Sequence, residues 1–227
     1  MIPHSSNEKE IIMPTIDTYK IRPKGNNLFL RVSRGHFATN HSHTNYYIDV
    51  TTQKSRLSEA QAVAEELVRY YSSSTIVDTI LCLDGTSVIG ACLARELTRS
   101  GFANMNSHET IYVVTPEHIT GSQLIFRDST KPMIEGKNVL ILAASVTTGY
   151  TAKSAVEAIN YYGGRAVGIS AIFATVDVCC GITVHSIFDP EGDLEDYVSY
   201  PALECPLCKN GKKIDALVNS YGFSKLL

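Results

Sequence analysis

The sequence predicts an α/β domain whose central sheet is largely parallel and carries helices on both faces. Strand-like and helix-like patterns alternate from residue 57 to about residue 175, which requires crossover connections between neighbouring strands. The run Val139-Leu140-Ile141-Leu142 is apolar without interruption, as in a strand that is buried on both faces. A small polar loop and a helix-forming segment follow it directly. This strand–loop–helix unit is the centre of the predicted fold.

Length and composition are those of a globular protein with one sizeable domain. The chain has 227 residues, of which 44% are hydrophobic and 19% are charged, and its net charge is -3. Basic residues form no block, so we expect no nucleic-acid partner. No apolar run approaches the length of a membrane span and the first ten residues lack a secretory pattern, so we expect a cytoplasmic protein.

The amino-terminal region is predicted to contain a tail and two strands. Residues 1–20 are polar and show little periodicity, and we interpret them as a tail or a loosely docked arm. Strands are expected at residues 28–32 and 46–50, which are rich in aliphatic and aromatic residues. The intervening stretch 33–45 is predicted to be a polar loop with three histidines, His36, His41 and His43. They allow a metal site, but no cysteine or carboxylate is interleaved at ligand spacing, which favours surface histidines and no metal.

A second strand–loop–helix unit precedes the central one. Apolar residues at helical spacing predict a helix over 58–71, and a strand is expected over 75–83. The turn Asp84-Gly85-Thr86-Ser87 then leads into a helix over 88–98, for which Ser87 is the expected cap. The turn is either an anion site at a helix amino terminus or a plain connection.

The remaining elements alternate in the same way, with one long interruption. A strand is expected over 109–114, and the mixed segment 115–137, with a short strand near 124–126, has the length of a lid or a mobile hairpin. After the central strand, the helix around 152–159 ends at Gly163-Gly164. Strands are expected over 165–173 and 182–188, and segments 198–208 and 214–223 close the chain.

The loop after the central strand favours an anion ligand. Ser145 to Gly149 are small or polar, and Thr147, Thr148 and Thr151 add hydroxyl donors to the free N–H groups of a helix start. A phosphate suits such a site best. The loop has no Gly-Lys-Ser/Thr sequence and is not a P-loop. A plain strand-to-helix turn is the alternative.

The six cysteines suggest no disulfide framework. Cys82 and Cys92 have apolar neighbours and are expected in the core. Cys205 and Cys208 form a C-x-x-C pair, which is half of a zinc site, a redox pair or a reduced pair in a structural turn. The sequence has no second C-x-x-C to complete a zinc site, so the structural turn is favoured.

The apolar strand followed by Thr147-Thr148-Gly149 resembles the phosphoribosyl pyrophosphate (PRPP) motif of type I phosphoribosyltransferases. Within that family the chain looks most like orotate phosphoribosyltransferase, over about residues 28 to 210. The stretch from Leu30 to Asp49, with Ser33-Arg34-Gly35-His36 and Tyr46-Tyr47-Ile48-Asp49, resembles that enzyme's amino-terminal strand and loop. The stretch from Glu204 to Lys209 resembles a carboxy-terminal segment of some bacterial members.

The resemblance implies a domain plan and a set of site residues. After the tail, residues 21–227 would form one domain, with a small hood at about 28–55, a core at about 57–190 that includes a flexible lid, and an extension at 191–227. Asp84, Gly85, Thr86 and Ser87 would form the pyrophosphate loop, and Arg34, Gly35 and His36 would help to form the base pocket. The residues that would hold the 5′-phosphate are Ser145, Val146, Thr147, Thr148, Gly149, Tyr150 and Thr151.

Two departures from the family pattern leave the activity open. Ala143 and Ala144 stand where the family has an acidic pair for the ribose hydroxyls, and the family's Arg-Lys pair and lid lysine are missing. Arg127, Lys131 and Asp84 are the candidate substitutes. The resemblance implies a pentosyltransferase that uses Mg²⁺ with PRPP, acts on a base such as orotate and forms homodimers. The alternative is a catalytically inactive relative that binds a nucleotide or a phosphorylated sugar as a sensor or partner protein.

Overall fold

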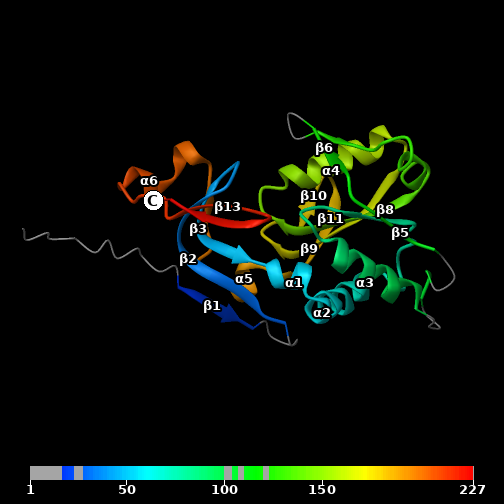
Figure 1. Cartoon of the computed structure of the whole chain (residues 1–227), viewed down its shortest axis with the longest axis horizontal. Coiled ribbons are helices and arrows are strands. Elements are labelled where there is room, and N and C mark those ends of the chain that lie inside the picture. The colour runs from blue at the N-terminus through cyan, green and yellow to red at the C-terminus, as the bar shows by residue number, and fades with distance from the viewer. Residues whose placement is uncertain (1–16, 23–27, 100–103, 107–109, 120–122, 227) are drawn as a thin grey trace, which may run out of the picture.

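The computed structural model describes residues 17–22, 28–99, 104–106, 110–119 and 123–226. Its two main sheets lie side by side (Figure 1), one built mostly from the middle of the chain and the other from both of its ends. We refer to them as the core sheet and the hood sheet.

The core sheet is parallel except at one edge. Its strand order is β10-β11-β9-β8-β4-β5, and only the short β10 runs antiparallel to its neighbour. Its strands, in chain order, are β4 (Thr79–Cys82), β5 (Tyr112–Val114), β8 (Asn138–Val146), β9 (Arg165–Ala174), β10 (Val178–Cys179) and β11 (Ile182–Phe188). The expected parallel sheet is confirmed, and its central strand β8 pairs with both β4 and β9.

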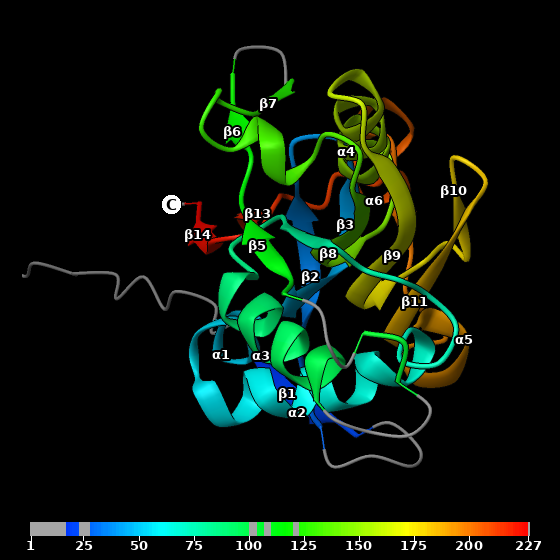
Figure 2. The ribbon, with the colours of Figure 1, turned by 90° about the vertical axis from the view of Figure 1, so that its right-hand side faces the viewer.

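Helices cover both faces of the core sheet, as Figures 1 and 2 show. Helices α2 (Leu57–Leu67) and α3 (Ser87–Thr98) share one apolar cluster with Leu140 and Leu142 of β8. Helix α4 (Tyr150–Tyr161) shares a second cluster with Ile141 and Ala143. Successive residues of the central strand therefore point to opposite faces, and both faces are buried, which is why the strand sequence is an unbroken apolar run.

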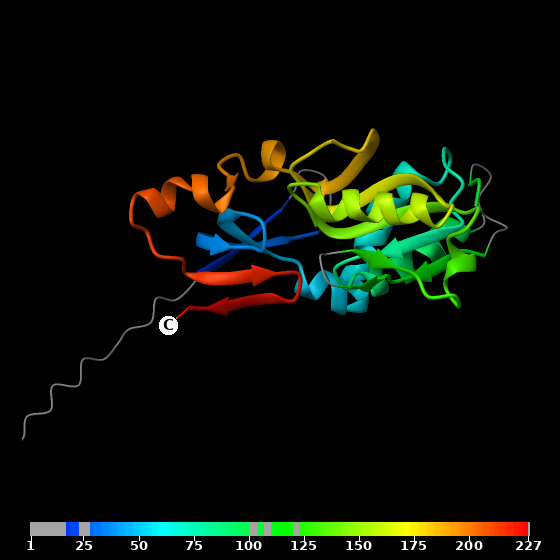
Figure 3. The same cartoon turned by 90° about the horizontal axis from the view of Figure 1, so that it is seen from above.

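The hood sheet joins the two ends of the described chain. Its order is β12-β3-β2-β13-β14, with β1 paired to β2. Its strands are β1 (Thr18–Ile21), β2 (Leu30–Ala38), β3 (His43–Asp49), β12 (Ser199–Tyr200), β13 (Ala216–Asn219) and β14 (Gly222–Lys225). Strand β13 lies parallel to the end of β2, so the carboxy-terminal hairpin extends the amino-terminal sheet (Figure 3).

The remaining elements are short. A two-stranded lid consists of β6 (Glu117–His118) and β7 (Leu124–Ile125). The others are α1 (Thr51–Ser55), η1 (Val68–Tyr70), η2 (Lys131–Met133), α5 (Pro190–Asp193), η3 (Ala202–Glu204) and α6 (Pro206–Lys209). Among the residues that the structure describes, no helix combines the length and the apolar character that crossing a bilayer requires.

Residues 18–20 of the predicted tail or loosely docked arm pair with β2 as part of the strand Thr18–Ile21. Residues 1–16 lie outside the described chain, so for them the tail stays a prediction. Two local predictions were wrong. The loop expected over 33–45 is in fact the short turn 39–42, because β2 continues to Ala38 and β3 begins at His43. Ser87 is the first residue of α3 and does not cap it; the cap position is Thr86, whose hydroxyl donates instead to the carbonyl oxygens of Leu83 and Leu142.

Candidate functional site

A cavity of about 260 Å³ lies where the carboxyl ends of β4 and β8 meet the hood sheet. This is the edge at which parallel α/β sheets bind ligands. Its core wall comprises Asp84, the loop from Ala144 to Ala152, and Phe173. Its hood wall comprises residues of the turn 39–42 and of β3, α1 and the β13–β14 hairpin, together with Tyr197.

The loop Thr147–Thr151 presents the amino end of α4 to this cavity. Gly149 takes the cap position with a φ of 72°, and no side chain caps the helix there. The first N–H groups of α4 consequently have no intrahelical partner. The loop is held from behind, since Thr175 donates its hydroxyl to the Thr147 carbonyl oxygen at 2.8 Å and its N–H to that of Val146 at 3.0 Å. The result is a braced loop with free donors and a favourable helix dipole, which suits an anion.

Asp84 lies directly beside the position of the missing acidic pair. Its backbone has a φ of 55°, in the left-handed region that aspartate tolerates better than most residues. Its carboxylate accepts a hydrogen bond from the backbone N–H of Ala144. Burial raises the pKa of Asp84, while the Ala144 N–H, the Lys54 ammonium and the His118 imidazole oppose that rise. One carboxylate thus borders the cavity although both family positions hold alanine.

The two alanines occupy different environments. Ala144 lines the cavity and packs with the α2–α3 cluster, whereas Ala143 packs beneath α4 and does not line the cavity. Both are buried, with exposed fractions of 2% for Ala143 and 3% for Ala144. Only Ala144 is therefore placed to present a side chain to a ligand.

Lys54 is a residue of this region that the sequence analysis missed. Its exposed fraction is 9%, and its ammonium donates to the Asp84 carbonyl oxygen at 2.8 Å and also to that of Ser220. Burial lowers the pKa of Lys54, against the nearby carboxylates of Asp84 and Asp49. Lys54 therefore fastens the Asp84 turn to the carboxy-terminal hairpin. In the sequence, Lys54 stands in a segment of ordinary polarity, which gives no sign that its side chain is buried. The burial of Lys54 arises from parts of the chain that are far apart in sequence.

The residues of the predicted pyrophosphate loop contribute unequally to the lining of the cavity. Asp84 lines the cavity, whereas Thr86 is fully buried and its hydroxyl bonds to the backbone. Gly85 has a φ of 76°, and Ser87 faces Thr115, with 3.2 Å between their hydroxyl oxygens. Gly85, Thr86 and Ser87 do not line the cavity.

Arg34, Gly35 and His36, the predicted base-pocket residues, lie outside the cavity. Arg34 pairs with Asp196 on the surface, and His36 points to the carboxy-terminal segment, where its Nδ1 contacts the carbonyl oxygen of Lys212 at 2.9 Å. A register shift in β2 between Arg34 and Phe37 reorients this stretch relative to a regular strand. The described residues that supply the hood wall in their place include Tyr46, Tyr47 and Ile48.

The two cations expected in the segment 115–137 are engaged away from the cavity. The Arg127 guanidinium donates two hydrogen bonds, each of 2.6 Å, to the carboxylate of Glu117 in β6. Lys131 lies in η2, and its ammonium is 3.9 Å from the Glu135 carboxylate. The described residues that line the cavity include no lysine and no arginine.

A second hollow of about 690 Å³ lies at the opposite end of the core sheet, near Arg165 and Ile182, where β9 and β11 begin. This second hollow is larger than the first cavity. It lies at the amino ends of the parallel strands, whereas the Thr147 loop lies at their carboxyl ends. The smaller cavity combines free helix N–H groups with a partly buried carboxylate, and it is the better candidate on chemical grounds.

Comparison with known proteins supports the resemblance seen in the sequence. No family model matches the chain. The chain is 27% identical over 184 residues to the orotate phosphoribosyltransferase of Chlorobium phaeobacteroides, covering 80% of this chain and 86% of that protein. It is also 27% identical over 186 residues to the orotate phosphoribosyltransferase of Chlorobaculum parvum, with the same coverage.

Solved structures confirm the fold. The structure of Leishmania donovani UMP synthase superposes with a TM-score of 0.50 and 18% identity, over 70% of this chain and 34% of that one. The chain thus has the type I phosphoribosyltransferase fold and is related at low identity to orotate phosphoribosyltransferases.

Proposed function

We propose that this phosphoribosyltransferase-like chain binds a 5′-phosphorylated ribose, as part of PRPP or a nucleotide, in the cavity between the core and hood sheets. The observation that carries the proposal is the position of the uncapped amino end of α4 beside the Asp84 carboxylate in one cavity. The 5′-phosphate accepts hydrogen bonds from the N–H groups and hydroxyls of Thr147–Thr151. Asp84 accepts hydrogen bonds from the ribose hydroxyls, as the only carboxylate among the described residues that line the cavity.

The aromatic side chains of the hood wall favour a ligand whose ribose carries a planar base. Tyr46, Tyr47 and Tyr197 line the cavity from the hood wall, and Phe173 lines it from the core wall, with its ring centroid 5.2 Å from that of Tyr197. Aromatic side chains of this kind accept the faces and edges of a planar base. At the rim, the rings of His41 and Tyr150 lie 4.7 Å apart between centroids, so the hood turn and the phosphate loop meet there.

Mg²⁺ is compatible with this set of donors. Proteins commonly hold Mg²⁺ through one or two carboxylates together with the substrate's phosphates, and Asp84 supplies one such carboxylate. When bound, the ion would neutralise charge on a pyrophosphate group. The residues of this chain would bind the 5′-phosphate and orient the ribose.

Transfer of the phosphoribosyl group to orotate is the second candidate function, and the identity to orotate phosphoribosyltransferases favours it. Against it, pyrophosphate would leave from a cavity whose described lining has no lysine or arginine. Preorganised positive groups act mainly on charge that develops in the transition state, so their loss lowers the rate more than the binding. Binding is therefore the function that the geometry supports best.

Calorimetric titration separates the two functions. We expect orotidine 5′-monophosphate and PRPP to bind at one site per chain, and Gly149→Ala to weaken both. Phosphoribosyl transfer predicts, in addition, that orotate is consumed when PRPP and Mg²⁺ are present. Absence of binding by either ligand to the folded protein would refute the proposal.

A further inference from the structure

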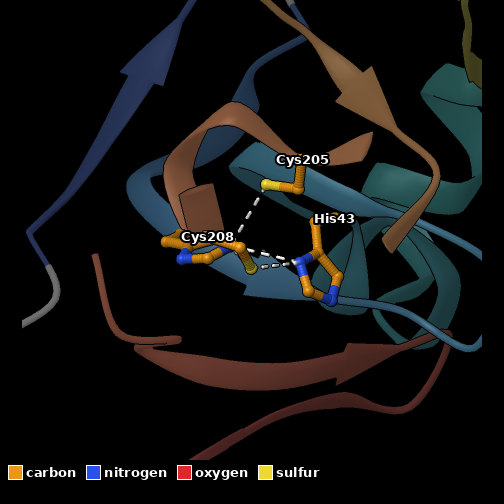
Figure 4. A group of neighbouring side chains, drawn as sticks. His43, Cys205 and Cys208 are labelled. Carbon is orange, nitrogen blue, oxygen red and sulfur yellow. Dashed lines mark hydrogen bonds between the residues drawn. The ribbon is translucent and has the colours of Figure 1, made fainter. Parts of the chain in front are cut away.

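Four potential metal ligands converge on one point at the outer end of the hood sheet. They are His36 of β2, His43 of β3, and Cys205 and Cys208, which flank the start of α6, and their ligand atoms all lie within 4.8 Å of one another. Figure 4 shows the side chains of His43, Cys205 and Cys208 pointing toward one another from the strand and the carboxy-terminal segment. The chain separation between His36 and Cys205 is 169 residues.

Four of the six distances between these ligand atoms match the edges of a tetrahedron around one ion. Zinc bonds of about 2.3 Å to sulfur and about 2.0–2.1 Å to nitrogen predict edges of about 3.3 Å between nitrogens and about 3.6 Å between nitrogen and sulfur. Nε2 of His36 lies 3.2 Å from Nδ1 of His43, 3.5 Å from Sγ of Cys205 and 3.6 Å from Sγ of Cys208. Nδ1 of His43 lies 3.2 Å from Sγ of Cys208.

The surroundings of His36 prepare it as a ligand. Its Nδ1 lies 2.9 Å from the carbonyl oxygen of Lys212 and 3.1 Å from that of Lys213. Because carbonyl oxygens only accept, Nδ1 must carry the proton, which leaves the lone pair of Nε2 directed at the cluster. Metal-binding histidines in proteins are commonly fixed in this way by a backbone carbonyl.

Backbone geometry also aims His36 into the cluster. The register shift in β2 frees the His36 N–H from the strand ladder, and the Asp215 carboxylate accepts it at 2.7 Å. The Asp215 N–H donates in return to the His36 carbonyl oxygen at 2.8 Å. At the neighbouring Gly35, a Cβ atom would lie 2.8 Å from the Asp215 carboxylate, so this arrangement excludes a larger residue there. The register shift in β2 and the contacts with Asp215 thus fix the orientation of His36.

Burial and charge favour an ion over an unoccupied cluster of polar side chains. His36 and Cys205 have exposed fractions of 0% and 1%, and the cysteines form no disulfide. Two thiolates and two neutral imidazoles around a divalent cation sum to zero charge, which suits a buried site. Cys208 is exposed and provides a route of entry. Two sulfur and two nitrogen ligands in a tetrahedron match zinc better than magnesium or calcium, which prefer oxygen.

We propose that His36, His43, Cys205 and Cys208 bind one structural Zn²⁺. All four positions are protein side chains, so no coordination site is left for a substrate, as in structural zinc centres. The ion links the β2–β3 hairpin to the segment that precedes β13. The hairpin reaches the cavity through its turn 39–42, and the chain that follows this segment reaches the cavity through Val218, Asn219 and Ser220. The zinc therefore holds the hood wall in place without touching the ligand.

Metal analysis of the full-length protein, purified with any affinity tag removed, tests this proposal directly. We expect close to one zinc ion per chain when the metal content is measured by inductively coupled plasma mass spectrometry. We also expect Co²⁺ exchanged into the site to show the intense visible bands and the thiolate charge-transfer band of tetrahedral coordination with sulfur. Zinc well below one per chain, with no such bands after Co²⁺ addition, would overturn the proposal. A Cys205–Cys208 disulfide in protein that was purified under reducing conditions would also overturn the proposal.

Matched variants locate the ion. Cys208→Ser and His43→Ala should each lower zinc affinity at least about tenfold in competition with a chromogenic chelator. Cys180→Ser, which changes an exposed free cysteine outside the cluster, should retain zinc fully. Circular dichroism checks that each variant is folded. A folded Cys208→Ser protein that holds zinc as tightly as the Cys180→Ser protein would contradict the assignment.

Discussion

The carboxylate of Asp84 accepts a hydrogen bond from the backbone N–H of Ala144. This contact connects the ends of two neighbouring parallel strands, since β4 and β8 pair through Cys82 and Leu142 just before these residues. It also brings a carboxylate to the place where the resemblance to phosphoribosyltransferases leads one to expect an acidic pair. Substitution of Asp84 separates a ligand-binding role of this carboxylate from a purely structural one.

Replacing Asp84 with asparagine should stabilise the protein and weaken ribose binding. Burial raises the pKa of Asp84 above its usual 3.8, so the folded state favours the neutral acid. That contribution to stability is present below pH 3.8 and is lost as the pH rises through the raised value. Asparagine stays neutral and can still accept from Ala144. We expect Asp84→Asn to melt at a higher temperature than the wild type at pH 7, with the difference vanishing toward pH 3.

The exposed Asp128 supplies the control for this charge change. Asp128→Asn should leave both the melting temperature and the affinity for orotidine 5′-monophosphate close to those of the wild type. If Asp84→Asn lowers stability and leaves the affinity unchanged, the carboxylate serves the turn and not the ligand.

Adding a methyl group at Gly149 should damage the phosphate loop specifically. Its φ of 72° costs about 1–2 kcal/mol for any L-residue, and the new Cβ would meet the Cys179 sulfur at 3.4 Å. Gly136 has a similar φ of 68° with nothing within 4 Å of a Cβ. Gly149→Ala and Gly136→Ala should therefore lose comparable stability in urea unfolding, but only the former should weaken nucleotide binding. Equal affinities would exclude the Thr147–Thr151 loop as the phosphate site.

Restoring acidic residues should succeed at only one of the two alanines. Ala144 lines the cavity, so Ala144→Asp should place a second carboxylate beside Asp84 and increase the affinity for PRPP with Mg²⁺, by about tenfold for one added charged hydrogen bond. Ala143 packs beneath α4, where Ala143→Asp buries an unpaired charge and should lower the melting temperature sharply. Calorimetry and thermal unfolding of both variants check this. A gain in affinity from Ala143→Asp would contradict the assigned orientation of β8.

Removing the buried ammonium of Lys54 should loosen the carboxy-terminal hairpin. Lys54→Met keeps most of the unbranched side chain but removes the ammonium, so the carbonyl oxygens of Asp84 and Ser220 lose this donor. Such a loss costs about 1–3 kcal/mol. We expect a lower melting temperature and faster hydrogen exchange in β13 and β14. Lys153→Met, at an exposed lysine of α4, is the control and should change neither.

Local patterns predicted the core sheet well, because its elements are defined by neighbours in sequence. The unbroken apolar run of β8 and the helical spacing in α2 reflect burial within single segments. Together these patterns also placed the Asp84 turn and the Thr147 loop at one sheet edge, where the Thr147 loop and, of the turn, Asp84 alone line the cavity.

The hood and the metal cluster could not be predicted in this way. His36 and His43 were interpreted as loop histidines because the glycine and polar residues around them hide a strand with an irregular register. Cys205 and Cys208 seemed to lack partners because their partners lie more than 160 residues earlier. Each half of the cluster is a weak signal alone, and the pairings of β12 with β3 and of β13 with β2 bring the halves together.

That pairing also has a consequence for biosynthesis. During translation β2 and β3 leave the ribosome well before β13 and both cysteines, because His36 precedes Cys205 by 169 residues. Until then the edge of β2 that later receives β13 lacks its neighbour, and an unpaired strand edge can recruit other chains. The hood sheet is thus begun before the core sheet and completed only after it. Chains truncated before Cys205 should aggregate more readily than the complete protein, even though they contain the whole core sheet.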